Sequence, residues 1–179
     1  TKPLKIVYPY EPDRYYIGRV EGMIDPMRQN EYANMMINIV IDGPFGYSHV
    51  MAHEINWDST VVTFDDDYSF DTVAPYDEHI TSDTTVEVYV NGYAFYPRMT
   101  LNGQGNDVTF SMNGKSFTVD LDGELIVDGS DFTVKRNGVN VFDELEGDFL
   151  ELLPGENQLS ISGTNMDFIL SIPFQDRYM

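Results

Sequence analysis

Residues 141–179 read VFDELEGDFLELLPGENQLSISGTNMDFILSIPFQDRYM, and this stretch decides the fold. Apolar runs flank PGEN at 154–157, which favours a sharp turn because Pro presets φ while Gly and Asn tolerate positive φ. SGTN at 162–165 predicts a second turn. Apolar residues then occupy every second position of FILSI at 168–172, so we expect the last strand of a core.

The same rhythm extends upstream to about residue 86. Apolar and polar residues alternate at 86–90, 108–112 and 117–121. An Asn-Gly pair between alternating runs is the strongest short-range signal for a hairpin. Such pairs, or Asp-Gly pairs, stand at 91–92, 102–103, 113–114, 122–123, 128–129 and 137–138. Short strands at this spacing, with no amphipathic helix after residue 50, predict an all-β domain at 86–179, an antiparallel β-sandwich or jelly roll.

The first 50 residues predict a smaller, β-rich segment. Extended patterns lie at 4–8, at 14–22 and in the β-branched second half of 31–41. DGP at 42–44 should end the third strand, and PFGY at 44–47 predicts an exit turn. Three short strands do not close a core, so we expect part of this domain to be absent or to be supplied by the main sandwich.

Residues 51–85 predict an acidic connecting excursion with one strand at 60–64. Residues 1–28 hold five Lys or Arg and four acids, whereas 29–97 hold no Lys or Arg and twelve acids. This shift predicts a boundary near residues 45–55. A connection of this length is typical of a functional or mobile loop.

Composition excludes several classes of protein. The 179 residues are 42% hydrophobic and 13% aromatic, enough apolar material for a folded core despite a net charge of −20. The chain has no Cys, which excludes disulfides, thiolate zinc sites and a Cys nucleophile. It has no apolar run of about 18 residues, so we expect no membrane span. A pI near 4.1 argues against binding nucleic acid, because phosphates require clustered Lys and Arg.

Motifs for chemistry are weak, and we predict no enzyme, no catalytic residue, no cofactor and no metal. Thirty carboxylates guarantee chance pairs, so a glycoside hydrolase is the lowest-ranked hypothesis. Asp65-Asp66-Asp67 and the DxDGE stretch at 120–124 lack the EF-hand spacing. His49 and His53 have the spacing of a helical zinc pair but lack the internal Glu of the metalloprotease motif.

Aromatic residues in or beside loops leave sugar binding as an alternative, because sandwich lectins present aromatic platforms. Packing in the core or in a subunit interface is the default interpretation of the same residues. They are Trp57, Tyr68, Phe70, Tyr76, Tyr93, Phe95 and Tyr96.

Several segments, taken in order, resemble one family. PDRYYIGRVEGMID at 12–25 and the strand running into DGPFGYS at 42–48 resemble the end of the N-terminal domain of the distal tail protein (Dit) family of long, flexible-tailed bacteriophages. Its galectin-like C-terminal sandwich is similar in order and spacing to four later segments. These are VYVNG at 88–92, YPRMTLNGQGNDVTFSMNGKSFTVDL at 96–121, LIVD at 125–128 and GDFLELLPGENQLSISG at 147–163.

The resemblance implies a non-enzymatic structural protein of a phage or prophage virion, made in the bacterial host cytoplasm and located at the tail tip. It implies a homohexameric ring that contacts the tail tube protein and the tail-associated tip protein, with a receptor-binding protein as a further partner. The family's first domain begins upstream of the position of Thr1, so we expect its first part to be absent here. The acidic stretch at 56–85 matches no family motif.

Two sets of residues follow as candidates. For assembly we nominate 14–20 and 37–47, with Arg14, Tyr15, Tyr16, Arg19, Phe45 and Tyr47 as the contacts. For an outward partner or a sugar we nominate Trp57, Tyr68, Phe70 and Tyr76. The alternative function is a carbohydrate-binding β-sandwich module for attachment to the host cell wall.

Overall fold

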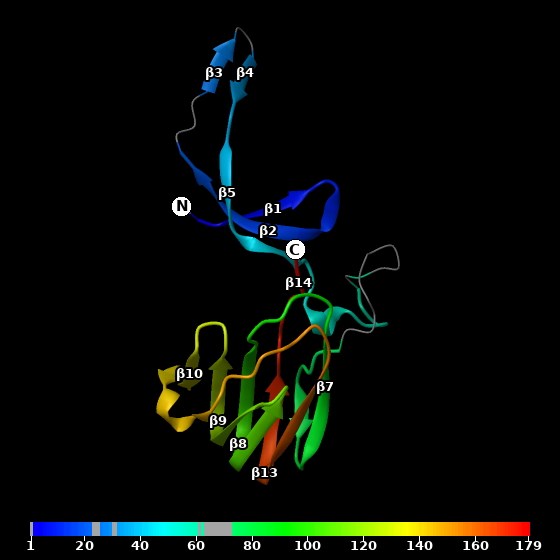
Figure 1. Ribbon diagram of the computed structural model, residues 1–179, viewed down its shortest axis with the longest axis vertical. Helices are drawn as coiled ribbons and strands as arrows, with labels where there is room; N and C mark the ends of the chain where they lie inside the picture. The colour runs from blue at the N-terminus through cyan, green and yellow to red at the C-terminus, as the bar shows by residue number, and fades with distance from the viewer. Residues whose placement is uncertain (1, 23–25, 30–31, 61, 63–72) are drawn as a thin grey trace. The chain divides into compact units, whose positions relative to one another are not determined.

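The computed structural model describes residues 2–22, 26–29, 32–60, 62 and 73–179 (Figure 1). Contacts divide the chain into two units, residues 1–49 with 177–179 and residues 50–176. The strands are β1 (Leu4–Tyr8), β2 (Glu11–Glu21), β3 (Pro26–Gln29), β4 (Tyr32–Met35), β5 (Asn38–Ser48), β6 (Glu78–Ile80), β7 (Thr84–Val90), β8 (Arg98–Met112), β9 (Lys115–Asp128), β10 (Thr133–Arg136), β11 (Val139–Asn140), β12 (Glu146–Gly147), β13 (Gly155–Ser171) and β14 (Arg177–Tyr178). Two single 3-10 turns, η1 (Ala52–Glu54) and η2 (Phe142–Glu144), are the helical elements of these residues.

The fold is all-β and antiparallel, as the sequence predicts. The first unit is a four-stranded sheet in the order β1-β2-β5-β14, and β3 and β4 form a separate hairpin between β2 and β5. The short last strand, β14, pairs with Gly46 and Tyr47 of β5. The first unit therefore contains the beginning and the end of the chain.

The predicted exit turn at 44–47 is wrong, because β5 continues to Ser48. Tyr15 pairs with Tyr47 and Tyr16 with Gly46, and the register then shifts so that Gly18 pairs with Ile41. Residues 42–45 thus stand opposite Ile17 alone. The polar, Gly- and Pro-containing stretch forms an irregularity within a strand instead of ending it.

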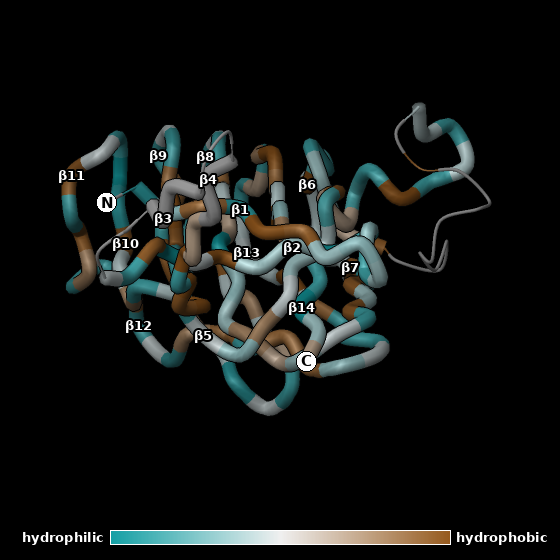
Figure 2. The backbone as a smooth tube through the Cα atoms, turned by 90° about the horizontal axis from the view of Figure 1, so that it is seen from above, coloured by the Kyte–Doolittle hydropathy of each residue, from teal (hydrophilic) through white to brown (hydrophobic). Residues whose placement is uncertain are grey.

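Three long strands, β8, β9 and β13, build both layers of the sandwich in the second unit. In one layer, residues 108–112, 115–119 and 155–162 pair with one another, with β12 and β7 at the edges. In the other, residues 98–105, 121–128 and 167–171 pair, with β10–β11 and β6 at the edges. Buried and more exposed positions alternate along much of these strands, and Figure 2 shows both hydrophobic and hydrophilic stretches in this unit.

Each long strand passes from one layer to the other at a corner. The β8–β9 register shifts between Gly105 and Val108, and the β13–β8 register shifts on both sides of Thr164. At the first corner, the Asp107 backbone N–H donates to the Asp120 carboxylate at 2.8 Å. β-Bulges bend strands and increase their twist, which is how one sheet folds over itself.

The core lies between the layers. Phe110 stacks on Phe117 of the neighbouring strand at 5.0 Å between ring centroids and meets Phe168 edge-on at 6.0 Å. All three side chains are at most 1% exposed. The predicted alternation at 168–172 is confirmed, because Phe168, Leu170 and Ile172 are buried.

Turn predictions divide into two groups. The pairs at 113–114 and 137–138 form the β8–β9 and β10–β11 hairpins, as predicted. The pairs at 102–103 and 122–123 do not reverse the chain, since they lie inside β8 and β9. The predicted turn at 162–165 is likewise a corner within β13.

The apolar run at 149–153 forms no strand. Its single ladder contact is the bridge between Leu152 and Phe95. The strand predicted at 60–64 falls largely outside the described residues. Residues 78–80 and 84–85, which the sequence placed in the acidic excursion, contribute β6 and the start of β7 to the sandwich.

Candidate functional site

The residues nominated for assembly all lie on β2 and β5, in the sheet of the first unit. On one face, the Tyr15 and Tyr47 rings stack at 5.7 Å. Lys5 Nζ lies 4.0 Å from the centre of the Tyr15 ring, and the Arg177 guanidinium lies 5.9 Å from that of Tyr47. His49 lies 5.3 Å from Tyr15. Aromatic rings and cations therefore alternate across this face.

The opposite face repeats the pattern with other residues. The Arg14 guanidinium lies 4.1 Å from the centre of the Tyr178 ring. Tyr16 meets Tyr8 edge-on at 5.4 Å and donates its hydroxyl to Glu11 at 2.7 Å. This hydrogen bond to a carboxylate raises the pKa of Tyr16.

The remaining two nominated residues contribute less to these faces. Arg19 lies 3.7 Å from Asp42 in an exposed ion pair, a geometry that adds little stability. Phe45 is half-buried within the irregular part of β5.

The first unit also exposes apolar side chains on residues 35–39, where β4 leads into β5; we call this segment the arm. Residues 38–39 pair with Val20 and Glu21, and the arm continues outward to β4 (Figure 1). Exposed apolar residues this close together are typical of protein contact surfaces. The group comprises Met35 (56% exposed), Met36 (79%), Ile37 (47%) and Ile39 (44%).

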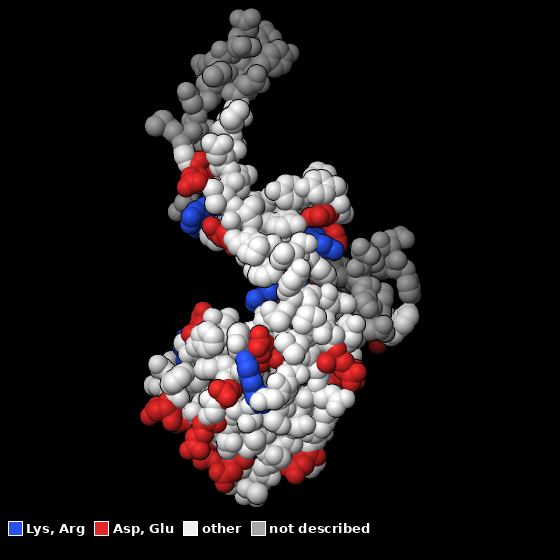
Figure 3. All heavy atoms as spheres, viewed as in Figure 1, with Lys and Arg blue, Asp and Glu red and all other residues white. Residues whose placement is uncertain are grey.

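Net charge is divided unequally between the units. The first unit holds six Lys or Arg and six Asp or Glu. The second unit holds four Lys or Arg and twenty-four Asp or Glu, so it carries the entire net charge of −20. Carboxylates spread over the visible face of the sandwich in Figure 3. The neutral unit is therefore the one that can approach its own copies without strong repulsion.

The residues nominated for an outward partner are only partly described. Trp57 is 77% exposed and Tyr76 is 50% exposed. The Tyr76 ring stacks flat on His53 at 3.9 Å between centroids. Tyr68 and Phe70 lie outside the described residues.

The other aromatic candidates differ in burial. Phe95 belongs to the core and contacts Phe174 at 5.3 Å. The Tyr96 hydroxyl accepts a hydrogen bond from Lys115 at 3.1 Å. Tyr93 is 43% exposed. Of these three, Phe95 is buried and so is not available to a sugar.

The described residues contain no group of three potential metal ligands. Residues 49–53 form no α-helix, because a 3-10 turn begins only at Ala52, so the helical His49/His53 face does not exist. In the stretch at 120–124, Arg136 donates to the backbone carbonyls of Asp120 and Asp122 and pairs with Glu144 at 2.7 Å. Residues 65–67 lie outside the described part.

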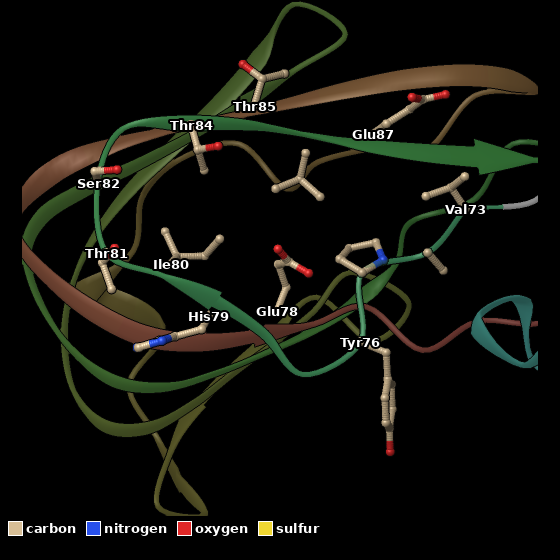
Figure 4. A pocket seen from close by; sticks show the side chains of 13 residues that line it. Val73, Tyr76, Glu78, His79, Ile80, Thr81, Ser82, Thr84, Thr85 and Glu87 are labelled. Carbon is tan, nitrogen blue, oxygen red and sulfur yellow. The ribbon is translucent and has the colours of Figure 1, made fainter.

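A cleft that sequence reasoning missed lies between the edge strands of the two layers, β6 and β7 (Figure 4). Its volume is about 430 Å³. Ile80 and Val86 line it with apolar side chains, and the Glu78 carboxylate projects into it. No motif marks residues 73–87, and the cleft exists only because the chain crosses between layers there.

One buried carboxyl gives a pH-dependent prediction for stability. Asp176 is 1% exposed, and one of its oxygens accepts the Asn91 backbone N–H at 3.0 Å, while the other has no hydrogen-bond partner in the described structure. Burial raises the pKa of Asp176 above its ordinary value of 3.8, against the opposing effect of the Asn91 hydrogen bond. The folded state holds this proton more tightly than the unfolded chain, so its stability falls as pH rises above that value.

We therefore expect D176N, which keeps the acceptor for Asn91, to melt at a higher temperature than the wild type at pH 7. The difference should vanish below a pH of about 3.8, where both side chains are neutral in both states. Thermal melts at several pH values measure this. A D176N variant that is less stable at pH 7 would contradict the assignment.

Comparison with protein-family models and with curated protein sequences finds no match. Among the residues that the structure describes, no helix has the length and apolar content needed to cross a membrane. The fold and surfaces thus define an all-β chain with a neutral, aromatic-rich sheet unit and a strongly acidic sandwich.

Proposed function

We propose that this chain is a non-enzymatic structural protein of a bacteriophage or prophage tail tip, a distal tail hub that connects the tail tube to the tip and receptor-binding apparatus. The ordered segments that resemble the Dit family support this proposal. The sequence of a β unit followed by a β-sandwich is consistent with it. In this proposal the first unit forms a homohexameric ring and contacts the tail tube protein and the tail-associated tip protein.

The division of charge is the observation that carries the proposal. Six sandwiches, each with a net charge of −20, repel one another at short distance. A ring must therefore be held by the neutral unit, which also has the exposed apolar arm and the two aromatic–cation faces. In such a ring the acidic sandwiches lie apart from one another, and they are available to outward partners.

The arm gives the test of which unit assembles. We expect the double variant I37D/I39D to lower the apparent assembly constant at least about 100-fold, because two buried charges without partners cost about 3 kcal/mol or more in an interface. Sedimentation velocity over a range of protein concentrations measures the loss. Both side chains are exposed in the single chain, so its fold should be retained.

V139D, which adds one charge where I37D/I39D adds two, is the control in the sandwich, because Val139 is 65% exposed and lies on β11. It should assemble like the wild type. Loss of assembly in V139D but not in I37D/I39D would place the contact in the sandwich and reject the proposal. Neighbouring reading frames for a tape-measure protein and a tail fibre or tail lysin would add independent support.

The second candidate is a carbohydrate-binding module for the host cell wall. The observation in its favour is Tyr76, half exposed and backed by His53, with the exposed Trp57 in the same region of the sequence. Titration with host cell-wall polysaccharide separates the two functions. Saturable binding that W57A/Y76A abolishes, in a chain that stays monomeric, would favour the module over the hub.

A further inference from the structure

The outer edge of β7 is open along part of its length. The Tyr89 backbone N–H donates to the Val73 carbonyl at 2.8 Å, so it faces away from β13. In a strand, alternate residues direct their backbone groups to the same side, so Thr85 and Glu87 face outward as Tyr89 does. The described residues supply no partner for the backbone groups of these two positions. Unpaired edge groups of this kind accept an added strand.

The cleft borders this open edge. The segment that begins at Val73 leaves β7, and β6 joins the other layer by pairing with residues 168–170 of β13. In Figure 4, Ile80 and Glu78 project from β6 into the gap, whereas the Tyr76 ring points away from it. A volume of about 430 Å³ is within the range of ligand sites. The Glu87 side chain points away from the gap, on the face of β7 opposite Val86. The cleft therefore combines an apolar lining, the open backbone groups of β7 and the Glu78 carboxylate.

Charge decides between the candidate occupants. No Lys or Arg occurs from residue 29 to residue 97. Of the four basic residues in the sandwich, Lys115 pairs with Glu151 at 2.9 Å and Arg136 with Glu144. A second copy adding its own β7 would bring the acidic residues of this edge, Asp83 and Glu87, close to those of the first copy. A sugar would find no ring surface in the gap, because Tyr76 is turned outward.

We propose that the β6–β7 cleft is a docking site for a basic, extended segment of a partner protein. The segment pairs its backbone with Thr85 and Glu87. Its Lys or Arg side chain lies along Val86, with the cationic head beside Glu78, the carboxylate that projects into the gap. Such a side chain suits the cleft because its stem is apolar and its end is charged. This site does not depend on ring formation, so it goes beyond the proposed hub function.

The test uses two capped pentapeptide probes, Thr-Val-Arg-Val-Thr and the same sequence with neutral citrulline in place of Arg. We expect the Arg probe to shift the amide resonances of Thr85 and Glu87 in ¹H–¹⁵N spectra of the whole chain. We expect the citrulline probe to bind about tenfold more weakly, the loss of one charge-assisted contact. E78Q/E87Q should bind both probes equally.

E124Q/E146Q is the control, because it removes the same charge from exposed positions elsewhere on the sandwich. It should keep the preference for Arg. The proposal is rejected if no shift occurs at about 10 mM probe, if citrulline binds as well as Arg, or if E78Q/E87Q keeps the preference. Shifts at Thr85 and Glu87 with a cell-wall saccharide but not with the Arg probe would also reject it. These outcomes are independent of the assembly test, because that test measures the mass of the particle and not the binding of a peptide.

Discussion

G103A is expected to destabilise the sandwich by at least about 3 kcal/mol, a large part of the stability of a domain this size. Gly103 lies next to the β8 corner with φ +147, where an L side chain is strained. A Cβ added there would lie 2.3 Å from the Asp167 carbonyl oxygen and 2.5 Å from the Phe168 Cα. Both are backbone atoms of β13, so the paired strand itself would have to move. Guanidinium unfolding followed by far-ultraviolet circular dichroism measures the loss.

G114A is the matched control for this prediction. Gly114 also has a positive φ, +78, but an added Cβ would meet nothing within 4 Å. Its cost should be only the left-handed backbone penalty of about 1–2 kcal/mol. If G103A and G114A lower the free energy of unfolding by the same amount, the close approach of β8 to β13 at Gly103 is contradicted.

N157D is expected to cost about 3–5 kcal/mol at neutral pH, although the two side chains have nearly the same shape. Asn157 is 1% exposed, and its amide nitrogen lies 2.8–3.2 Å from the carbonyl oxygens of Val88, Leu153 and Gly155. Its amide oxygen accepts from the Leu153 N–H and the Asn113 side chain. A carboxylate would direct negative charge at three acceptors.

The cost of N157D should depend on pH in a defined direction. Burial and the three carbonyls raise the pKa of the introduced carboxyl in the folded state, so stability should recover as pH falls toward about 4. Amide hydrogen exchange in β7 and β13, measured at several pH values, reports the free energy of unfolding of the sandwich alone. Q158E adds the same charge on an exposed neighbour and should cost no more than about 1 kcal/mol. A cost for N157D that is independent of pH would contradict the hydrogen-bond assignment.

The Asn-Gly pairs explain how much of the fold the sequence could predict. At 113–114 and 137–138 both residues adopt positive φ, which is the geometry of a two-residue hairpin turn. At 102–103 only the glycine does, and its φ of +147 lies outside that turn geometry. The dipeptide is the same, but at 102–103 the chain continues within β8, where Asn102 and Gly103 pair with Ile169 and Phe168 of β13. Local patterns predicted the all-β class, and long-range pairing decided which glycines reverse the chain.

The candidate sites also contain residues that the sequence predicted and residues that it missed. The extended, aromatic pattern at 14–22 and the family resemblance of that segment were the basis for nominating Arg14, Tyr15 and Tyr16, and the sheet places partners beside them. Lys5 and Arg177 were missed because they are distant in sequence and meet these rings only after β1 and β14 pair. The β6–β7 cleft was missed because it is created by the chain's passage between layers, which no short motif encodes.

The mass of the particle that the chain forms in solution tests the account most directly. Light scattering at several salt concentrations should give about six times the chain mass of 20.4 kDa, with assembly strengthened as salt screens the −20 charge of each sandwich. A mass of 20.4 kDa at every salt and protein concentration would contradict the proposal that the neutral unit builds a hub.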